Sequence, residues 1–255
     1  MSQLFKFFLN SIPRPWLIRL SYAVRPIIAW LLSGKRYVDP IDGKGFRKFL
    51  PYGYENPREN VLAPATFSLE RHRLLWLFLK RKTSFFYDRL KVLHVAPEQA
   101  FYKRFRNQKN LEYITTDLYS PLADVKADIC NLPFKNGEFD VILCNHVLEH
   151  IPNDKKAMKE LHRVLKKGGW GVFQVPQDLS RKTTFEDDSI TDKKERAKIF
   201  GQYDHVRIYG SDYFDKLRSV GFKVEEIHLA KSLSKVEIDR FRLAADEIIP
   251  WVKKI

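Results

Sequence analysis

The chain has 255 residues, 44% of them hydrophobic, which is enough to build one domain of about 150–200 residues with appendages. Lysine and arginine outnumber aspartate and glutamate by 45 to 31, and the formal net charge of +14 favours anionic partners such as phosphate-bearing substrates, acidic lipid or nucleic acid. Two cysteines, Cys130 and Cys144, exclude a disulfide scaffold and a cysteine-based metal site. We expect both to be reduced core residues of a cytoplasmic protein.

Residues 1–38 form a basic, aromatic-rich arm that contains no acidic residue. Prolines at positions 13, 15 and 26 predict short, broken helices, and the longest charge-free apolar piece, residues 26–34, is too short to span a membrane. No cleavable signal pattern is present. Two expectations stay open for this arm. The first is that residues 1–36 lie on an anionic membrane surface, at the inner face of the membrane. The second is that aromatic side chains such as Trp16 and Trp30 pack on the following domain.

Residues 39–67 are rich in proline and glycine and are expected to form loops. A helix is predicted to begin at Ser68, whose hydroxyl is suited to cap the free amide groups of the first turn. The apolar residues that follow extend this helix to about Thr83.

From Lys91 onward, strands and helices alternate. Buried strands are predicted at 91–95, 111–115, 139–144 and 170–175, with later strands at 224–229 and 246–252, the last one antiparallel. A helix capped by Asn153 or Asp154 precedes the fourth strand and is expected to stop at Gly168 and Gly169, and another runs from Ser211 to Gly221. This alternation predicts an α/β fold with a parallel sheet and helices on both faces.

In such sheets the ligand lies outside the carboxyl ends of the strands. Asp117 ends the second predicted strand, where an acidic residue commonly binds the ribose hydroxyls of a nucleotide cofactor. Asp128 lies about ten residues further on and is suited to accept a hydrogen bond from an adenine amino group.

Five sequence stretches in this order resemble the core signature of class I S-adenosylmethionine-dependent methyltransferases: 128–129, 132–134, 139–142, 146–150 and 161–169. The resemblance implies a Rossmann-like fold with a mostly parallel seven-stranded sheet and an antiparallel last strand. It implies S-adenosylmethionine as cofactor. Asp117 and Leu118 would then lie at the ribose, Asp128 and Ile129 at the adenine, and Asn145 and His146 at the methionine end.

The first turn, residues 94–99, departs from the family because it has no glycine, and Pro97 lacks an amide hydrogen. We still assign His94, Ala96 and Glu98 to the cofactor site. A related branch of methyltransferase-like proteins resembles the chain more fully, since it shares this His-x-Ala-Pro-Glu turn, the Ser-Leu-Glu-Arg-His-Arg sequence at 68–73 and the stretch 201–207.

That branch often carries paired Cys-x-x-Cys motifs, like a small zinc ribbon, before the helix at residue 68. The matching positions here are Asp39, Asp42, Ala63 and Thr66, and Ala63 has no ligand atom for tetrahedral zinc. We therefore expect three parts: an arm at 1–38, a metal-free ribbon-like segment at 39–67, and a methyltransferase domain at 68–255.

His146, Glu149 and His150 also match the reversed zinc-protease motif, but the stretch directly follows a sheet strand and Pro152 ends it, so neither a protease nor a metal site is predicted. An oxygen or nitrogen acceptor needs a base, and His146, His150 and His205 are the candidates. The alternative for each of these three residues is a structural histidine that is held by hydrogen bonds. The charged stretch 177–210 is expected to cover the substrate.

These observations predict methyl transfer from S-adenosylmethionine to a small or anionic acceptor. The alternative is a catalytically inactive, methyltransferase-like binding or scaffold protein, because the first turn is unusual. Nucleic acid is not expected as the main partner, since no aromatic-basic RNA motif is present beyond the arm.

Overall fold

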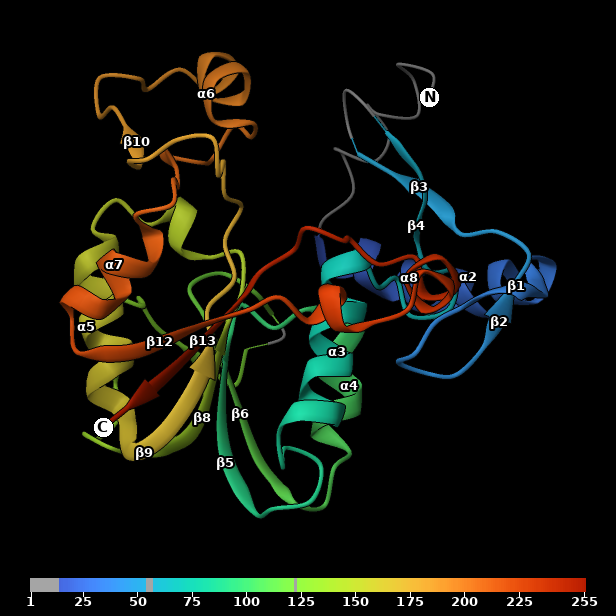
Figure 1. Ribbon diagram of the computed structural model, residues 1–255, viewed down its shortest axis with the longest axis horizontal. Helices are drawn as coiled ribbons and strands as arrows, with labels where there is room; N and C mark the ends of the chain where they lie inside the picture. Colours follow the sequence, from blue (N-terminus) through green and yellow to red (C-terminus); the bar gives the residue numbers. More distant parts are fainter. Residues whose placement is uncertain (1–13, 54–56, 122) are drawn as a thin grey trace. The chain divides into compact units, whose positions relative to one another are not determined.

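The structure, a computed structural model, describes residues 14–53, 57–121 and 123–255, and it consists of two compact units (Figure 1). Unit 1 comprises Met1–Thr83 and Ala230–Glu247, and unit 2 comprises Ser84–Leu229 and Ile248–Ile255. Residues 68–83 thus group with the N-terminal part of the chain. The expected division into parts at 38 and 67 stays a prediction.

Unit 2 is built on a seven-stranded sheet with the order β12-β13-β9-β8-β5-β6-β7. Its strands are β5 (Leu90–Val95), β6 (Leu111–Asp117), β7 (Val125–Lys126), β8 (Phe139–Cys144), β9 (Leu165–Val172), β12 (Phe222–Ile227) and β13 (Ile249–Lys254). The strands from β9 to β7 pair in parallel, whereas β13 is antiparallel to both of its neighbours. The predicted mostly parallel sheet with an antiparallel last strand is confirmed.

Helices cover both faces of this sheet: α5 (Asp154–Val164) and α7 (Tyr213–Ser219) on one side, α4 (Gln99–Arg106) on the other (Figure 1). Helix α5 buries Ala157, Met158 and Leu161 against the sheet core, as its apolar stripe predicts. Asn153 caps this helix by accepting a hydrogen bond of 2.9 Å from the Lys156 amide. Burying each large apolar side chain of such a core contributes about 1.5–3 kcal/mol.

Helix α5 ends earlier than predicted. The predicted stop was Gly168, but the helix ends at Val164 and the glycines lie inside β9. Leu165 already pairs with Phe139 of β8, so sheet pairing determines the boundary. A Cβ atom added at Gly171 would lie 2.8 Å from the Ile142 carbonyl oxygen. This close approach of the neighbouring strand explains why a glycine occupies the position within a buried strand.

Between β9 and α7 the chain makes a long excursion that contains β10 (Phe185–Glu186), α6 (Lys193–Phe200) and β11 (Arg207–Ile208). Figure 1 shows β10 and α6 extending beyond the edge of the sheet at which β9 ends. This excursion is the segment 177–210 that the sequence predicts as a substrate cover. Strands β10 and β11 pair with each other, so the segment has secondary structure of its own.

Unit 1 contains α2 (Arg14–Leu31), β1 (Ser33–Val38) paired with β2 (Gly45–Phe46), β3 (Leu50–Tyr52) paired with β4 (Arg58–Leu62), α3 (Glu70–Lys82) and α8 (Lys235–Phe241). A short 3-10 helix, η2 (Leu229–Ser232), precedes α8.

Helix α2 corrects the prediction of short, broken pieces, because residues 14–31 form one helix with Pro26 inside it. A proline removes one amide donor and bends a helix without always ending it. Residues 1–13 of the predicted arm lie outside the described part of the chain. The side chain of Trp30 is 75% exposed within unit 1, and its packing on the following domain stays a prediction. In the described residues, no helix combines the length and apolarity needed to cross a membrane.

Helix α3 begins at Glu70, two residues later than predicted, and without the expected cap. Its N-cap is Leu69, whose amide donates to His72 Nδ1 at 3.0 Å, while Ser68 is fully buried and bonds elsewhere. The predicted end of the helix near Thr83 is confirmed.

Arg73 of α3 is fully buried and joins the two chain segments of unit 1. Its guanidinium donates to the carbonyl oxygens of Val61 and Ser68 and, far along the chain, to those of Phe241 and Arg242 at 2.7 and 2.6 Å. Burial lowers the pKa of Arg73 to about 10, so it stays charged at neutral pH. A buried cation is tolerated here because carbonyl oxygens surround it.

The ribbon-like segment is organised around Asp39, which is also fully buried. Its carboxylate accepts hydrogen bonds from the Ile41 amide at 3.0 Å, from the Ser68 hydroxyl at 3.1 Å and from the Thr66 hydroxyl. Two of the four positions matched to ribbon ligands, Asp39 and Thr66, are thus bonded to each other. That this segment holds no metal stays a prediction.

Candidate cofactor and acceptor site

Polar side chains follow three neighbouring parallel strands of unit 2 at the point where each strand ends. Glu98 comes shortly after β5, Asp117 ends β6 and Asn145 follows β8. The strands β6, β5 and β8 are adjacent and parallel, so their carboxyl ends lie at one edge of the sheet. This is the edge at which open α/β sheets bind ligands.

The first turn adopts a conformation that glycine usually supplies. Ala96 has a φ of 48°, in the left-handed region, and its amide donates to the Thr116 carbonyl oxygen at 2.8 Å. A non-glycine residue there costs about 1–2 kcal/mol. The backbone of this turn therefore follows a glycine-like path although the sequence has no glycine in it.

Glu98 is held from two sides. One carboxylate oxygen contacts His94 Nε2, and the other accepts a hydrogen bond of 3.4 Å from the side-chain amide of Asn145. His94 is fully buried, and its Nδ1 lies 2.7 Å from the Tyr113 hydroxyl. Full burial makes His94 a residue that positions Glu98, and its predicted contact with the cofactor stays a prediction.

Asp117 has a fixed orientation at the end of β6. Its Oδ1 accepts hydrogen bonds of 2.7 Å from the amides of Tyr119 and Ser120, which form the turn after the strand. The side chain of Leu118 is 48% exposed beside it. A carboxylate next to an exposed apolar side chain is suited to a ribose and its attached base.

Asp128 and Ile129 lie in a loop that α5 holds in place. Asp128 is exposed, and its Oδ1 accepts from the Cys130 amide at 2.8 Å, whereas Ile129 is buried. Downstream in the loop, Arg163 of α5 donates to the Leu132 and Phe134 carbonyl oxygens, both at 2.8 Å.

Asn145 and His146 are tied to the segment after β9. Asn145 is 3% exposed, and its side-chain oxygen accepts from the Gln174 amide at 3.2 Å. The His146 amide donates to the Gln174 carbonyl oxygen at 2.7 Å, and its φ of 53° places it in the left-handed region. Gln174, which the sequence did not single out, thus shapes the predicted methionine end.

His146, Glu149, His150 and His205, which we call the acceptor cluster, meet close to this end of the site. Glu149 and His150 lie on a 3-10 helix, η1 (Leu148–His150), directly after β8. Ligand-type atoms of Glu149, His150 and His205 all lie within 4.8 Å of one another, and His146 Nδ1 lies 3.4 Å from Glu149 Oε1. The structure therefore brings together the three predicted bases and adds Glu149.

Charges within the acceptor cluster act on each other. Burial alone would raise the pKa of Glu149, but the imidazoles of His146 and His150 outweigh it and hold that pKa below its ordinary value. Burial lowers the pKa of His205, only partly opposed by Glu149. Glu149 is thus ionised and His205 neutral at neutral pH.

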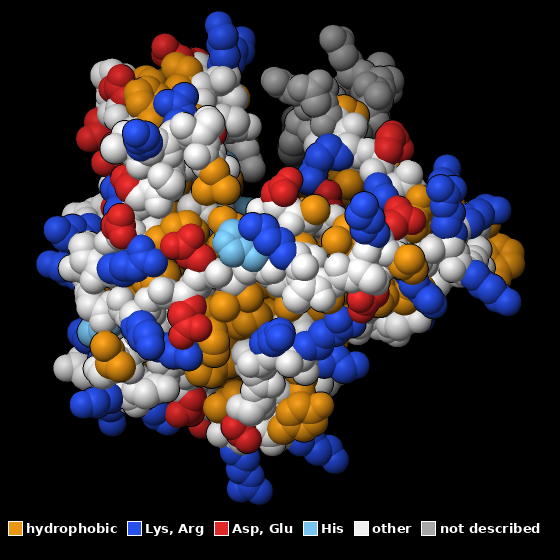
Figure 2. Space-filling model, viewed as in Figure 1, with side chains coloured by type: hydrophobic (Ala, Val, Ile, Leu, Met, Phe, Trp, Pro, Cys, Tyr) orange, Lys and Arg blue, Asp and Glu red, His pale blue; other side chains and the backbone are white. Residues whose placement is uncertain are grey.

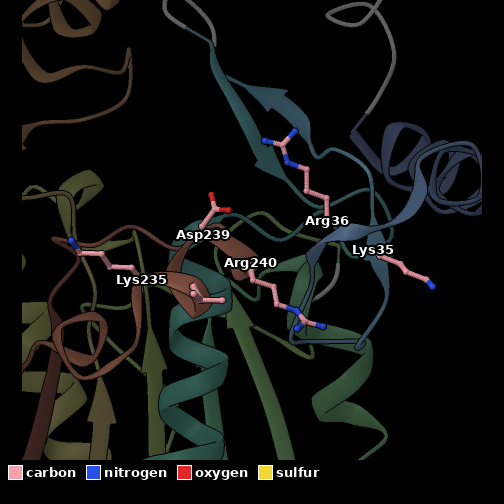
Figure 3. Close-up of a pocket in the computed structure, with 6 residues that line it drawn as sticks. Lys35, Arg36, Lys235, Asp239 and Arg240 are labelled. Atoms are coloured by element: carbon pink, nitrogen blue, oxygen red, sulfur yellow. The ribbon is translucent and has the colours of Figure 1, made fainter.

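A separate basic pocket of about 470 Å³ lies in unit 1, lined by Lys35, Arg36, Lys235, Val236, Asp239 and Arg240. Figure 3 shows its basic side chains pointing in different directions, and Asp239 forms an ion pair with Arg242 at 3.0 Å. Charges that do not converge make a weak anion site. In Figure 2, lysine and arginine side chains are likewise spread over the visible face, with acidic residues among them.

Comparison with known proteins gives three kinds of relative. Residues 83–173 match the family model described as a methyltransferase domain. Two uncharacterized proteins of Methanocaldococcus jannaschii are 40% and 32% identical to the chain, over 38% and 43% of its length and 43% and 49% of theirs. The aligned part of the chain thus spans about half of these curated relatives. A crystal structure titled as the [4+2]-cyclase SpnF has a TM-score of 0.51 at 16% identity, covering 85% of this chain and 91% of that one, and it shows a shared fold.

The cofactor of this family, S-adenosylmethionine, fits the residues present. The glycine-like backbone at Ala96, the oriented carboxylate of Asp117 and the exposed carboxylate of Asp128 lie where a nucleoside needs a close backbone approach and acceptors for its hydroxyl and amino groups. The family match spans the first five strands of the sheet along the chain, β5 to β9, which pair in parallel as the resemblance implies. Residues 83–173 therefore belong to the methyltransferase domain family, of the class I, S-adenosylmethionine-dependent type.

Proposed function

We propose that the chain transfers a methyl group from S-adenosylmethionine to a small or anionic acceptor. The observation that carries this proposal lies directly after β8. There Asn145, whose side chain contacts Glu98, immediately precedes the acceptor cluster in the chain. A cofactor site and a set of titratable groups thus adjoin each other in one stretch of chain, as transfer between two bound molecules requires.

Bound S-adenosylmethionine supplies an electrophilic methyl group on a sulfonium. Asp117 binds the ribose hydroxyls, Asp128 accepts from the adenine, and Glu98 and Asn145 orient the methionine end. The segment 177–210 excludes water from the acceptor. These roles agree with the placement of each side chain at the carboxyl edge of the sheet.

We assign the removal of the acceptor proton to the acceptor cluster. His205 Nδ1 lies 3.1 Å from the Phe200 carbonyl oxygen, which only accepts, so Nδ1 carries the hydrogen and Nε2 a lone pair. Its lowered pKa keeps this imidazole neutral. An O–H or N–H acceptor would pass its proton to such an imidazole while the acceptor atom forms the bond to the methyl carbon.

The second candidate is a binding or scaffold protein without catalysis. The shared fold with a protein named as a cyclase supports keeping it, because this fold alone does not determine the reaction. The two candidates differ in whether residues of the cofactor site bind S-adenosylmethionine.

Calorimetric titration of the full chain with S-adenosylmethionine and with S-adenosylhomocysteine tests the proposal. We expect heat from both, with about one site per chain, and an Asp215→Asn variant, changed at an exposed residue, should bind as the wild type does. If the wild-type chain gives neither heat nor a thermal shift at millimolar cofactor, the scaffold candidate replaces the enzyme.

We also propose that the chain acts at an anionic membrane surface on the cytoplasmic side. Residues 1–83 hold fifteen lysines and arginines against five acidic residues, so they carry most of the net positive charge. On α2, the side chains of Ile27, Trp30 and Leu31 are all more than half exposed and lie three and four positions apart, which places them on one helix face. Exposed apolar side chains beside basic ones are typical of interfacial helices.

A further inference from the structure

Glu149 is an almost fully buried carboxylate that lies among three histidines. Its side chain is 1% exposed, and neither carboxylate oxygen has a hydrogen-bond partner in the described part of the chain. The contact with His146 is an ion pair of 3.4 Å between His146 Nδ1 and Glu149 Oε1. An ionised carboxylate without donors is strongly unfavourable in the interior unless a cation balances it.

Two neighbouring imidazoles are oriented as metal-binding histidines are. His150 Nδ1 lies 3.2 Å from the Asp204 carbonyl oxygen and His205 Nδ1 lies 3.1 Å from that of Phe200. Carbonyl oxygens only accept hydrogen bonds, so both Nδ1 atoms carry hydrogen and both Nε2 atoms have lone pairs. A backbone carbonyl that accepts from the second ring nitrogen is the usual support of a histidine ligand.

The fold provides no hydrogen-bond partner for the lone pair of His205 among the residues that the structure describes. Nε2 of His146 is likewise buried without a hydrogen-bond partner among these residues. The rings of His150 and His205 meet at an 80° angle with centroids 4.7 Å apart. Glu149, His150 and His205 each offer one ligand-type atom, and these three atoms lie within 4.8 Å of one another, as the ligands of a single ion do before it draws them together.

We propose that Glu149, His150 and His205 bind one divalent transition-metal ion, with His146 beside it. Two imidazoles and one carboxylate suit zinc, iron(II), manganese or cobalt, whereas magnesium and calcium prefer oxygen ligands. Three protein ligands leave a position open for an oxygen atom of a bound molecule. The proposal concerns metal binding and does not require methyl transfer. In a metal-bound chain the ion uses the Nε2 lone pair of His205, which then does not remove a proton.

The proposed site differs from the two metal sites that the sequence analysis considers, the zinc ribbon and the reversed zinc-protease motif. It involves none of the ribbon positions, and the reversed protease motif would require its two histidines on a regular helix, whereas η1 has three residues. His205, which lies 55 residues after His150, replaces His146 in the ligand set. The prediction of no metal site did not consider this third residue.

Metal uptake by the full-length chain tests the proposal. The protein is stripped with a chelator, incubated with zinc or cobalt(II), desalted and analysed for metal content and, with cobalt, for visible absorption. We expect about one ion per chain, and His150→Asn and His205→Asn should each weaken zinc binding by about tenfold or more in competition with a chromophoric chelator. His228→Asn, changed at an exposed histidine, should bind zinc as the wild type does.

Several results would overturn the proposal. One is a wild-type chain that takes up no zinc or cobalt after stripping. Another is a His150→Asn chain, altered at a part-exposed residue and checked for folding by circular dichroism, that binds zinc with wild-type affinity. A third is uptake that disappears in Asp39→Asn with Asp42→Asn, which would locate the ion in the ribbon-like segment. Cofactor calorimetry is a separate measurement, so failure of one proposal is distinguishable from failure of the other.

Discussion

Arg207 Nη1 donates a hydrogen bond of 3.0 Å to the carbonyl oxygen of Leu148, 59 residues earlier in the chain. The same guanidinium donates to the Ile151 and Pro152 carbonyl oxygens and pairs with Glu186 at 2.9 Å. These bonds satisfy the carbonyl groups at the end of η1. They hold the stretch 201–207, which contains the candidate base His205, at the acceptor cluster.

Replacing Arg207 should therefore loosen the segment 177–210. In Arg207→Ala the buried carbonyl oxygens lose their donor, which costs roughly 1–3 kcal/mol for each acceptor left unpaired. We expect a lower melting temperature and faster proteolytic cleavage within 177–210. Arg207→Lys should recover only part of the loss, because an ammonium lacks the planar fork. Arg181→Ala, at an exposed ion pair, is the control, and equal proteolysis of both alanine variants would contradict the role of Arg207.

Removing the carboxylate of Asp117 should weaken cofactor binding. In Asp117→Ala the ribose hydroxyls lose an acceptor and the turn loses its bond to the Tyr119 and Ser120 amides, and we expect a loss of about 1–3 kcal/mol in calorimetry. Asp117→Asn keeps an oxygen for these amides and should bind with intermediate affinity. If both variants bind S-adenosylmethionine as the wild type does, Asp117 does not contact the cofactor.

Ala96→Gly should stabilise unit 2 slightly rather than harm it. Glycine removes a left-handed strain of about 1–2 kcal/mol, while its greater freedom in the unfolded chain offsets about 0.4–1 kcal/mol of that gain. Thermal unfolding should show an unchanged or higher melting temperature, with cofactor affinity retained. A clear loss of stability would mean that the Ala96 methyl group makes packing contacts worth more than the strain.

Glu160 should contribute stability that depends on pH. Arg163 donates two hydrogen bonds of 2.8 Å to its carboxylate and holds the pKa of Glu160 below its ordinary value, against the opposing effect of burial. A folded-state pKa below the unfolded one, near 4.5, stabilises the fold above that pH, and the stabilisation is lost as the pH falls through the folded value. Glu160→Gln should thus lower the melting temperature at pH 7 and have a smaller effect near pH 3. An equal effect at both pH values would rule out the charge as its cause.

The exposed face of α2 should determine membrane binding. Ile27, Trp30 and Leu31 changed together to alanine should reduce sedimentation with acidic vesicles, because interfacial burial of these side chains is lost. Salt should also reduce it, since charges are screened over about 8–10 Å at physiological ionic strength. Val236→Ala and Tyr87→Ala, each at an exposed apolar residue, are the controls. The proposed membrane location would be rejected if neither the triple alanine variant nor added salt reduced sedimentation. It would also be rejected if the wild-type chain stayed in the supernatant with acidic vesicles.

Local patterns predicted the elements whose boundaries depend on nearby residues. The stripe of α5, its cap at Asn153 and the buried strand β8 are readable because their periodicity and capping are local. Strand β7 has only two residues and no periodicity, so the sequence did not indicate where the seventh strand lies. Ser68 resembles a helix cap by type, but its hydroxyl donates to the buried Asp39 carboxylate and accepts from Arg73 Nη1 instead.

The residues of the site likewise divide into those that local patterns could assign and those that depend on distant parts of the chain. Asp117 and Asp128 could be assigned from their positions at strand ends, whereas the burial of His94 depends on the aromatic side chains around it. The contact of Glu149 with His205 depends on the Arg207 bonds across 55–59 residues, which spacing does not reveal. The His-x-x-Glu-His spacing was the available signal, but Glu149 was interpreted only as part of the methyltransferase signature and of the reversed protease motif.

Arg73 has a consequence for the order in which the chain folds during synthesis. Two of its acceptors, the carbonyl oxygens of Phe241 and Arg242, lie 168 and 169 residues further along. While the ribosome is still making the sheet of unit 2, this buried cation has only its nearby acceptors. The N-terminal unit therefore closes only after residues 241 and 242 have been made, although its first residues emerge first, and a nascent chain cut before residue 241 should expose Arg73 and its helix to chaperones and proteases.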